Sequence, residues 1–227
     1  SLMEAGIGEA TTFSNVVKKM KTTRNFGFDL CWSRVAYAQQ WLIREDVSGA
    51  VLCTGSLFQI PFRDNSIDVV YTYHALEPNG GNEEAILKEL YRVAGKFLVL
   101  MEPGYEFASR EAQQRMEKHG YCINIAGSAE GLGYKIIEHD SFPLIYDDAN
   151  PSALTVIEKT LTETNSAEEV LACPQYRTPL ETINGALYSP EAQSVYPIVA
   201  GIPCLRSRDA IVATKFQEIM FKRQFVS

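Results

Sequence analysis

The sequence predicts an α/β domain followed by a small β-rich domain. Over the first 160 residues, apolar runs of strand length alternate with amphipathic stretches of helix length, which is typical of a sheet with helices on its faces. Beyond residue 170 the chain becomes dense in Pro, Gly, Tyr and Ser, and no long helical period remains. We therefore expect domains at residues 1–162 and 168–227, joined by the polar stretch TETNSAEE (162–169).

Five apolar runs are the candidate strands of the first domain. Each is short and is followed by turn residues or by an amphipathic stretch. These runs are Leu2–Ala5, Asn25–Asp29, Ala50–Thr54, Ile67–Tyr73 and Lys96–Glu102.

Two stretches between these runs carry apolar residues at helical spacing, so both are expected to pack on the sheet. The stretch 33–45 begins with Ser33 as its expected cap and gathers Val35, Ala38, Leu42 and Ile43 on one face. The stretch 82–94 does the same with Ile86, Leu87, Leu90 and Val93.

Two later segments, 132–144 and 152–160, are separated only by the turn-rich YDDANP. So short a connection predicts an antiparallel hairpin at the edge of the sheet. The C-terminal stretch 171–210 contains only short apolar pieces, so we expect hairpins and loops there.

Composition excludes several classes of protein. The net charge of −7 argues against a nucleic-acid binder, because such binding depends on Lys and Arg neutralising phosphates. No apolar run approaches the roughly 18 residues of a membrane span. The five cysteines are scattered without a CxxC pair, which indicates reduced thiols, a cytoplasmic protein and no metal site.

The opening stretch MEAGIGEATTF carries the first chemical motif. Gly6 and Gly8 let the chain turn after a strand and let backbone N–H groups approach a ligand, which is typical of nucleotide-binding loops. Asp29 follows Gly8 by 21 residues, at the end of the next apolar run, where a carboxylate can accept both hydroxyls of a ribose. These features suit a nicotinamide-dependent dehydrogenase as well as other nucleotide-binding enzymes.

Further residues narrow the choice. EAGIGEATTF, GFDLCWSRVAYAQQ, GSLFQIPFRDNSIDVVYTYHALEP, EAILKELYRVA and KFLVLMEP follow one another in an order that resembles the class I S-adenosylmethionine-dependent methyltransferases of the type-11 family. The resemblance implies a Rossmann-like, doubly wound, mostly parallel sheet with an antiparallel edge strand, and S-adenosylmethionine as cofactor. It also implies that an N-terminal helical segment common in the family is missing, and that 105–125 is the substrate-facing insertion.

The same resemblance assigns residues to parts of the cofactor. Glu4, Ala5, Gly6 and Gly8 would bound the methionine end, and Asp29 would hold the ribose. Leu30, Ser56 and Leu57 would lie beside the adenine, with Ser56 replacing an acid that the family usually carries. Tyr73 would be a further cofactor neighbour.

His74 is expected beside the methyl acceptor. Methyl transfer from a sulfonium depends mainly on alignment, so a base matters only when the acceptor must lose a proton. His74 is then the candidate general base and Glu77 the second candidate. The alternative is that His74 only caps the strand or binds a backbone carbonyl.

The C-terminal stretch resembles a zinc-ribbon-like domain. That domain occurs alone as the activating subunit of several tRNA and translation-factor methyltransferases, or fused behind a methyltransferase; LACPQYRTPL and YPIVAGIPCL carry the likeness. Of the four positions that hold zinc in metal-containing members, only Cys173 matches; Tyr176, Ser189 and Ala192 replace the others. We therefore expect no zinc, and apolar packing by Tyr176, Tyr188, Tyr196, Ile198, Ile202 and Leu205 instead.

The leading hypothesis is a methyltransferase acting on a small molecule, with the second domain docked on the first as a stabiliser. A tRNA or protein acceptor is the second substrate class. A catalytically inactive, cofactor-binding scaffold is a different class of function, and a dehydrogenase is a further alternative. The sequence leaves the oligomeric state open, a homo-oligomer included.

Overall fold

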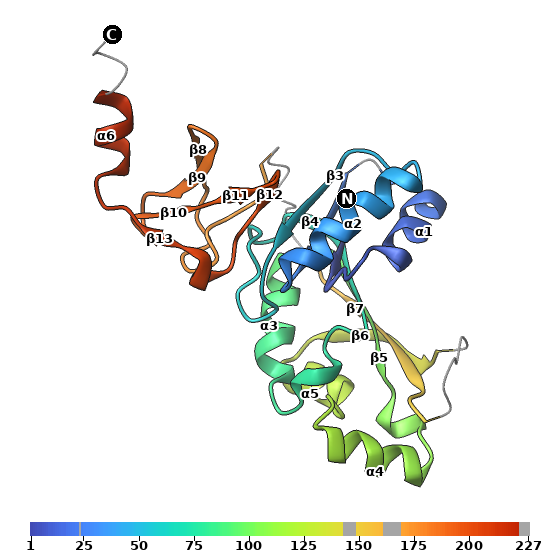
Figure 1. Ribbon diagram of the computed structural model, residues 1–227. Helices are drawn as coiled ribbons and strands as arrows, with labels where there is room; N and C mark the ends of the chain where they lie inside the picture. The colour runs from blue at the N-terminus through green and yellow to red at the C-terminus, as the bar shows by residue number, and fades with distance from the viewer. Residues whose placement is uncertain (23, 143–148, 161–168, 223–227) are drawn as a thin grey trace.

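The protein is built around one mixed seven-stranded sheet. The computed structural model describes residues 1–22, 24–142, 149–160 and 169–222. The strand order is β3-β2-β1-β4-β5-β7-β6 (Figure 1). The first five strands in this order are parallel, and β7 is antiparallel to both of its neighbours, β5 and β6. Because β1 lies next to β4, the sheet has the switch in strand order at which doubly wound folds bind ligands.

The elements of the first domain alternate between strand and helix up to β5, except that β4 follows β3 without a helix between them. Its strands are β1 (Leu2–Ala5), β2 (Asn25–Asp29), β3 (Ala50–Thr54), β4 (Ile67–Tyr73), β5 (Ala94–Pro103), β6 (Lys135–Ser141) and β7 (Ser152–Glu158). Its helices are α1 (Thr11–Met20), α2 (Trp32–Arg44), α3 (Glu83–Val93), α4 (Arg110–His119) and α5 (Ile125–Gly131), with short 3-10 turns η1 (Glu77–Asn79) and η2 (Tyr105–Phe107).

Two hydrophobic clusters cover the two faces of the sheet. Helices α1 and α2 contribute Phe13, Val35 and Leu42 to one cluster. Helix α3 contributes Ile86 and Leu90 to the other. Figure 1 shows the two pairs of helices, α1 with α2 and α3 with α5, on opposite sides of the strands.

The predicted elements agree closely with the structure. Four of the five candidate strands have the predicted bounds, β5 is longer at both ends, and the hairpin of β6 and β7 lies at the sheet edge as predicted. All of the linker 162–169 except Glu169, and most of the turn between the hairpin strands, lie outside the described residues.

Helix α2 shows two differences from the prediction. The cap is Cys31 and not Ser33, because the helix begins at Trp32 and leaves Ser33 inside its first turn. Ile43 is 79% exposed, whereas Val35, Ala38 and Leu42 are buried as predicted. Ile43 directly follows Leu42, and adjacent helix positions cannot both face the sheet centre.

The C-terminal region is a small β-rich module, as predicted. Its strands are β8 (Glu181–Ile183), β9 (Ala186–Ser189), β10 (Ser194–Tyr196), β11 (Ile198–Val199), β12 (Ile202–Pro203) and β13 (Ile211–Val212). Four of them form an antiparallel sheet in the order β13-β10-β9-β8, and β11 pairs with β12. The 3-10 turn η3 (Ser207–Asp209) and helix α6 (Phe216–Lys222) complete it, and the prediction did not include α6.

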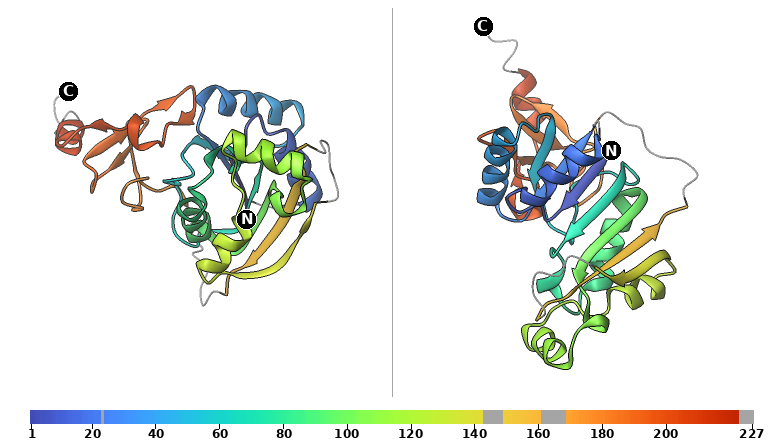
Figure 2. Two further views of the ribbon diagram at one scale, coloured as in Figure 1. Left: turned by 90° about the horizontal axis from the view of Figure 1, so that it is seen from below. Right: turned by 90° about the vertical axis from the view of Figure 1, so that its right-hand side faces the viewer.

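The module is docked along the β3 edge of the large sheet, and both views of Figure 2 show it against the first domain. Thr54 of β3 forms a parallel bridge with Cys204. The backbone N–H of Leu205 donates to the Thr54 carbonyl at 3.2 Å and to its hydroxyl at 3.1 Å. A second contact between the module and the first domain is made by Ala172, whose N–H donates to the Pro61 carbonyl at 3.0 Å.

The positions at which the sequence resemblance implied zinc ligands differ in burial. Cys173 and Ser189 are fully buried, and the Cys173 sulfur lies 3.5 Å from the hydroxyl of the buried Tyr196. The prediction that Tyr176 fills this space is wrong, because its side chain is 56% exposed. Ile202 is buried, but it packs in the cluster that covers α1 and α2 of the first domain.

None of the helices in the described part of the chain is long and apolar enough to cross a membrane.

Candidate functional site

A cavity of about 880 Å³ lies at the carboxyl ends of β1, β2 and β4. The turn after β1 forms its floor, where Gly6 and Gly8 have φ angles of +78° and +54°. A Cβ on Gly6 would lie 2.5 Å from the Cβ of Ala75, so glycine is required there by both its conformation and its packing. The tight turn brings backbone N–H groups to the cavity without side chains in the way.

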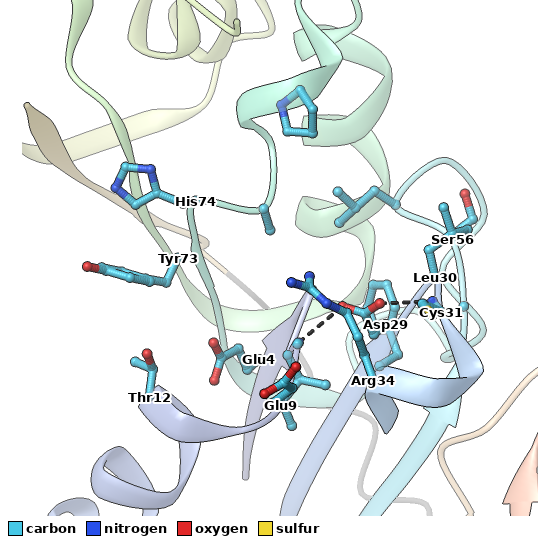
Figure 3. Close-up of a pocket in the computed structure, with 18 of the residues that line it drawn as sticks. Glu4, Glu9, Thr12, Asp29, Leu30, Cys31, Arg34, Ser56, Tyr73 and His74 are labelled. Atoms are coloured by element: carbon cyan, nitrogen blue, oxygen red, sulfur yellow. Dashed lines mark hydrogen bonds between the residues drawn. The ribbon is translucent and has the colours of Figure 1, made fainter. Parts of the chain in front are cut away.

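Asp29 ties this turn to the next strand. Its two carboxylate oxygens accept hydrogen bonds from the N–H of Gly8 at 3.1 Å and from the N–H of Cys31 at 2.9 Å, drawn dashed in Figure 3. A carboxylate has about four acceptor positions, so positions remain for a ligand's hydroxyl groups. The glycine turn and the acid, 21 residues apart in sequence, therefore line one cavity.

Glu4 is the buried acid of the cavity. It is 3% exposed, and the hydroxyl of the buried Tyr71 donates to its Oε2 at 2.7 Å. Burial raises the pKa of Glu4 to about 8, although the Tyr71 hydrogen bond acts in the opposite direction. A cation bound beside Glu4 would stabilise the ionised carboxylate, so this end of the cavity suits a positively charged ligand.

The opposite end of the cavity is built by two loops. Leu30 is 54% exposed at the end of β2, and Ser56 and Leu57 follow β3. Ser56 uses its hydroxyl to accept from the N–H of Phe58 at 3.3 Å, which holds the loop closed on itself. Figure 3 shows Leu30 and Ser56 across the cavity from Tyr73 and His74.

His74 sits where β4 ends, in an unusual conformation. Its φ is +50°, and its N–H donates to the carbonyl of Met101. The ring nitrogens lie 2.6 Å from Glu77 Oε2 and 2.7 Å from Ser152 Oγ. Burial alone would lower the pKa of His74, but the bond to Glu77 and the nearby charge of Glu102 outweigh it, so the pKa is raised.

This arrangement bears on the two roles that the sequence left open for His74. Both ring nitrogens are already bonded within the protein, and the raised pKa favours the charged ring, which has no lone pair to take a proton. To act as a base, His74 must be neutral and must give up its contact with Ser152. The ring contacts two side chains and not the backbone carbonyl of the alternative prediction, and the general-base role stays a prediction.

The loop that follows His74 is fixed by a buried acid. Glu102 at the end of β5 accepts the N–H groups of Ala75 and Leu76 at 3.0 and 3.1 Å. Burial raises the pKa of Glu102 to about 7. The loop that carries Ala75 against Gly6 is thus held from behind by main-chain hydrogen bonds.

Nearly all the predicted site residues line the cavity: Glu4, Gly6, Gly8, Asp29, Leu30, Ser56, Leu57, Tyr73 and His74. Ala5 is the exception, because it is fully buried in the hydrophobic core and successive strand residues point to opposite faces. None of the lining residues comes from 105–125, the predicted substrate-facing insertion.

Several lining residues were not predicted from the sequence. Figure 3 shows Arg34 reaching from α2 into the cavity, with Glu9, Thr12 and Cys31 around it. Hydrogen bonds from the backbone N–H groups of Arg34 and Ser33 lower the pKa of the exposed Cys31 thiol. Among the residues that the structure describes, no group of three or more His, Cys, Asp or Glu is placed to hold a metal ion.

Two stretches of the chain match known protein families. Residues 3–98 match the methyltransferase domain family, and residues 169–201 match the Trm112p-like protein family. No curated protein was found to match the sequence.

Solved structures show the same fold at low sequence identity. A putative methyltransferase from Bacillus halodurans is 15% identical with a TM-score of 0.56, over 70% of this chain and 92% of that one. Magnesium protoporphyrin IX methyltransferase from Synechocystis, solved with bound SAH, is 16% identical with a TM-score of 0.56, over 70% and 74%. A complex of the Haloferax volcanii Trm112 methyltransferase activator and a putative methyltransferase is 15% identical with a TM-score of 0.57. The match covers 72% of this chain and 83% of that one.

Proposed function

We propose that this chain, which carries a class I S-adenosylmethionine-dependent methyltransferase domain followed by a Trm112p-like module, transfers a methyl group to a small-molecule acceptor. The observation that carries the proposal is the hydrogen bond from Gly8 N–H to Asp29, which unites the glycine turn and the acid at one cavity. In that cavity Asp29 would bind the ribose hydroxyls.

The charges along the cavity support this orientation of the cofactor. Glu4 and the backbone of Gly6 would face the cationic methionine end of the cofactor. A cation at this place would favour the ionised form of the buried Glu4 carboxyl. Leu30, Ser56 and Leu57 would flank the adenine at the other end. The methyl group would then point toward Tyr73 and His74.

The chain's own residues would act by alignment. The sulfonium supplies the reactive methyl group and leaves as a neutral thioether, so the protein need not protonate a leaving group. His74 and Glu77, fixed to each other and to Ser152, would shape the acceptor side. The cavity is partly open and is lined by the acids Glu4, Glu9 and Asp29, so it is a concave acidic site and not a basic surface, which favours a small acceptor.

The module supports the first domain within the same chain. Its segment at Cys204 and Leu205 covers the β3 edge, so a separate protein would have to displace it to pair there. We propose that the module stabilises the methyltransferase domain in this way. The five free thiols, four of them buried, support a cytoplasmic location.

A tRNA or protein acceptor is the second candidate, favoured by the match of residues 169–201 to the Trm112p-like family. The acidic net charge of −7 weighs against tRNA. The dehydrogenase alternative loses its support, because residues 3–98 match a methyltransferase domain.

The experiment is a calorimetric titration followed by an acceptor screen. We expect S-adenosylmethionine to bind and NAD not to bind. Separate incubations with metabolite pools, bulk tRNA and protein extract, followed by mass spectrometry for added methyl groups, would then identify the acceptor class. Binding without turnover on any pool would favour the inactive scaffold, and absence of cofactor binding at millimolar concentration would refute the proposal.

A further inference from the structure

The C-terminal module contacts the first of the two loops that we assign to adenine. The Arg206 guanidinium donates from Nη1 to the carbonyl of Leu30 at 2.8 Å. Two residues further along, the Trp32 indole N–H donates to the carbonyl of Val199 at 3.3 Å. The start of α2, which also presents Cys31 and Arg34 to the cavity, is therefore bonded to the module on both sides of Cys31.

The module also contacts the second loop. Ser207 donates from its hydroxyl to the side-chain oxygen of Gln59 at 2.5 Å. Gln59 is bridged to Ser56, and its backbone N–H donates to the Ser56 carbonyl at 3.1 Å. The consecutive residues Arg206 and Ser207 thus reach the loops on both sides of the same end of the cavity.

Arg206 is held in place before it reaches Leu30. Its Nε and Nη2 donate to the two carboxylate oxygens of Asp209, each at 2.7 Å. Asp209 also lies 3.4 Å from the hydroxyl of Thr54, on the strand that the module covers. A bidentate pair of this kind fixes the plane of the guanidinium and leaves Nη1 directed at the Leu30 carbonyl.

We propose that Arg206 is a positioning residue for cofactor binding: through the Leu30 carbonyl it holds the adenine-side loop in the binding conformation. The inference deepens the proposed function and rests on it, since it assumes that Leu30 and Ser56 flank adenine. Arg206 does not line the cavity, so it acts through Leu30 and not by touching the ligand.

Thermodynamic reciprocity gives the proposal a second consequence. If the docked module strengthens cofactor binding, then cofactor binding must strengthen docking of the module by the same factor. Saturating ligand should therefore slow amide exchange at the N–H of Leu205, which donates to Thr54. This readout needs only the unaltered chain.

The test compares two neighbouring arginines in the full-length protein. Arg206→Ala removes the bonds to Leu30 and Asp209, whereas Arg208→Ala removes an exposed arginine from the same turn. The dissociation constants of S-adenosylmethionine and of adenosine alone are measured for both variants, well below their unfolding temperatures. Hydrogen exchange of the unaltered chain is recorded with and without S-adenosylmethionine.

We expect Arg206→Ala to raise the dissociation constants of both ligands about tenfold. Arg208→Ala should leave both constants within about twofold of those of the unaltered chain. An equal loss of affinity for adenosine and for S-adenosylmethionine places the effect at the adenine end of the cavity. If Arg206 served folding alone, Arg206→Ala would lower the unfolding temperature without changing the affinity for adenosine. Unchanged affinity in Arg206→Ala overturns the inference. If that variant does not fold, unchanged exchange at Leu205 overturns it. Failure of the unaltered chain to bind either ligand refutes the proposed function instead.

Discussion

The buried carboxyl of Glu4 makes cofactor binding depend on pH. Its pKa of about 8 arises from burial, and the Tyr71 hydroxyl bonds the carboxyl at 2.7 Å. The methionine end of S-adenosylmethionine carries a sulfonium and an ammonium group, which favour the ionised acid. We therefore expect affinity to rise as the pH approaches and passes 8.

The size of the effect follows from the ionised fraction. At pH 7, a group with a pKa of about 8 is ionised in roughly one molecule in eleven, and at pH 9 in about ten of eleven. If the cofactor binds only the ionised form, its apparent affinity rises about tenfold between these values. Binding at pH 7 should also release nearly one proton per site.

The same group lowers stability at neutral pH. The unfolded chain loses the Glu4 proton near the ordinary value of 4.5, whereas the folded chain keeps it until about pH 8. The contribution of Glu4 to stability is therefore fully present below pH 4.5 and is lost as the pH rises toward 8. Glu4→Gln, which keeps an acceptor for Tyr71, should raise the free energy of unfolding at pH 7 by up to about 3 kcal/mol.

Calorimetry in buffers of different ionisation enthalpy measures both affinity and proton release. Glu9→Gln is the matched control, because Glu9 lines the same cavity but is exposed. The cofactor's own titration is common to all variants, so the difference between Glu4→Gln and Glu9→Gln isolates Glu4. The reasoning is refuted if binding to the unaltered chain at pH 7 releases no proton, or if Glu4→Gln keeps the same pH dependence.

Three further changes test other parts of the cavity. Asp29→Asn should weaken S-adenosylmethionine at least tenfold by calorimetry, because a ribose acceptor is lost, while the exposed Asp46→Asn should not. Gly6→Ala should lower the unfolding midpoint and abolish binding, since its Cβ would lie 2.5 Å from Ala75; normal binding would disprove the packing argument. Cys31, exposed while the four other cysteines are buried, should react first with iodoacetamide in a mass-spectrometric time course, and saturating cofactor should slow it; equal labelling of all five would contradict this.

The sheet was predictable because its strands carry a strong local signal. Runs such as Asn25–Asp29 and Ile67–Tyr73 are short and rich in apolar residues, and their bounds agree with β2 and β4. Helix faces were predicted less well where the apolar stripe was ambiguous. Ile43 fits an amphipathic pattern as well as Leu42 does, and only the position of α2 on the sheet decides between them.

Without the family resemblance, the site was predictable only where a motif fixes the backbone. Gly6, Gly8 and Asp29 are recognisable because the turn and the strand end require those residue types. Arg34, in the first turn of α2, and Glu9, in the turn before α1, carry no such requirement, and charged residues at such positions are usually solvated. Their approach to the cavity depends on how α1 and α2 pack, which no local pattern encodes.

The module gains its hydrophobic core from the neighbouring domain. A region this small buries too little apolar surface to be stable alone, and zinc commonly supplies the difference. Here Cys173, Tyr196 and Leu205 belong to the same hydrophobic cluster as Ile86 and Leu90 of α3. The module therefore shares its core with the first domain, and we infer that docking on that domain stabilises the module. Because the edge of β3 is covered by the same contact, stability of the module and protection of the sheet edge cannot be separated in this chain.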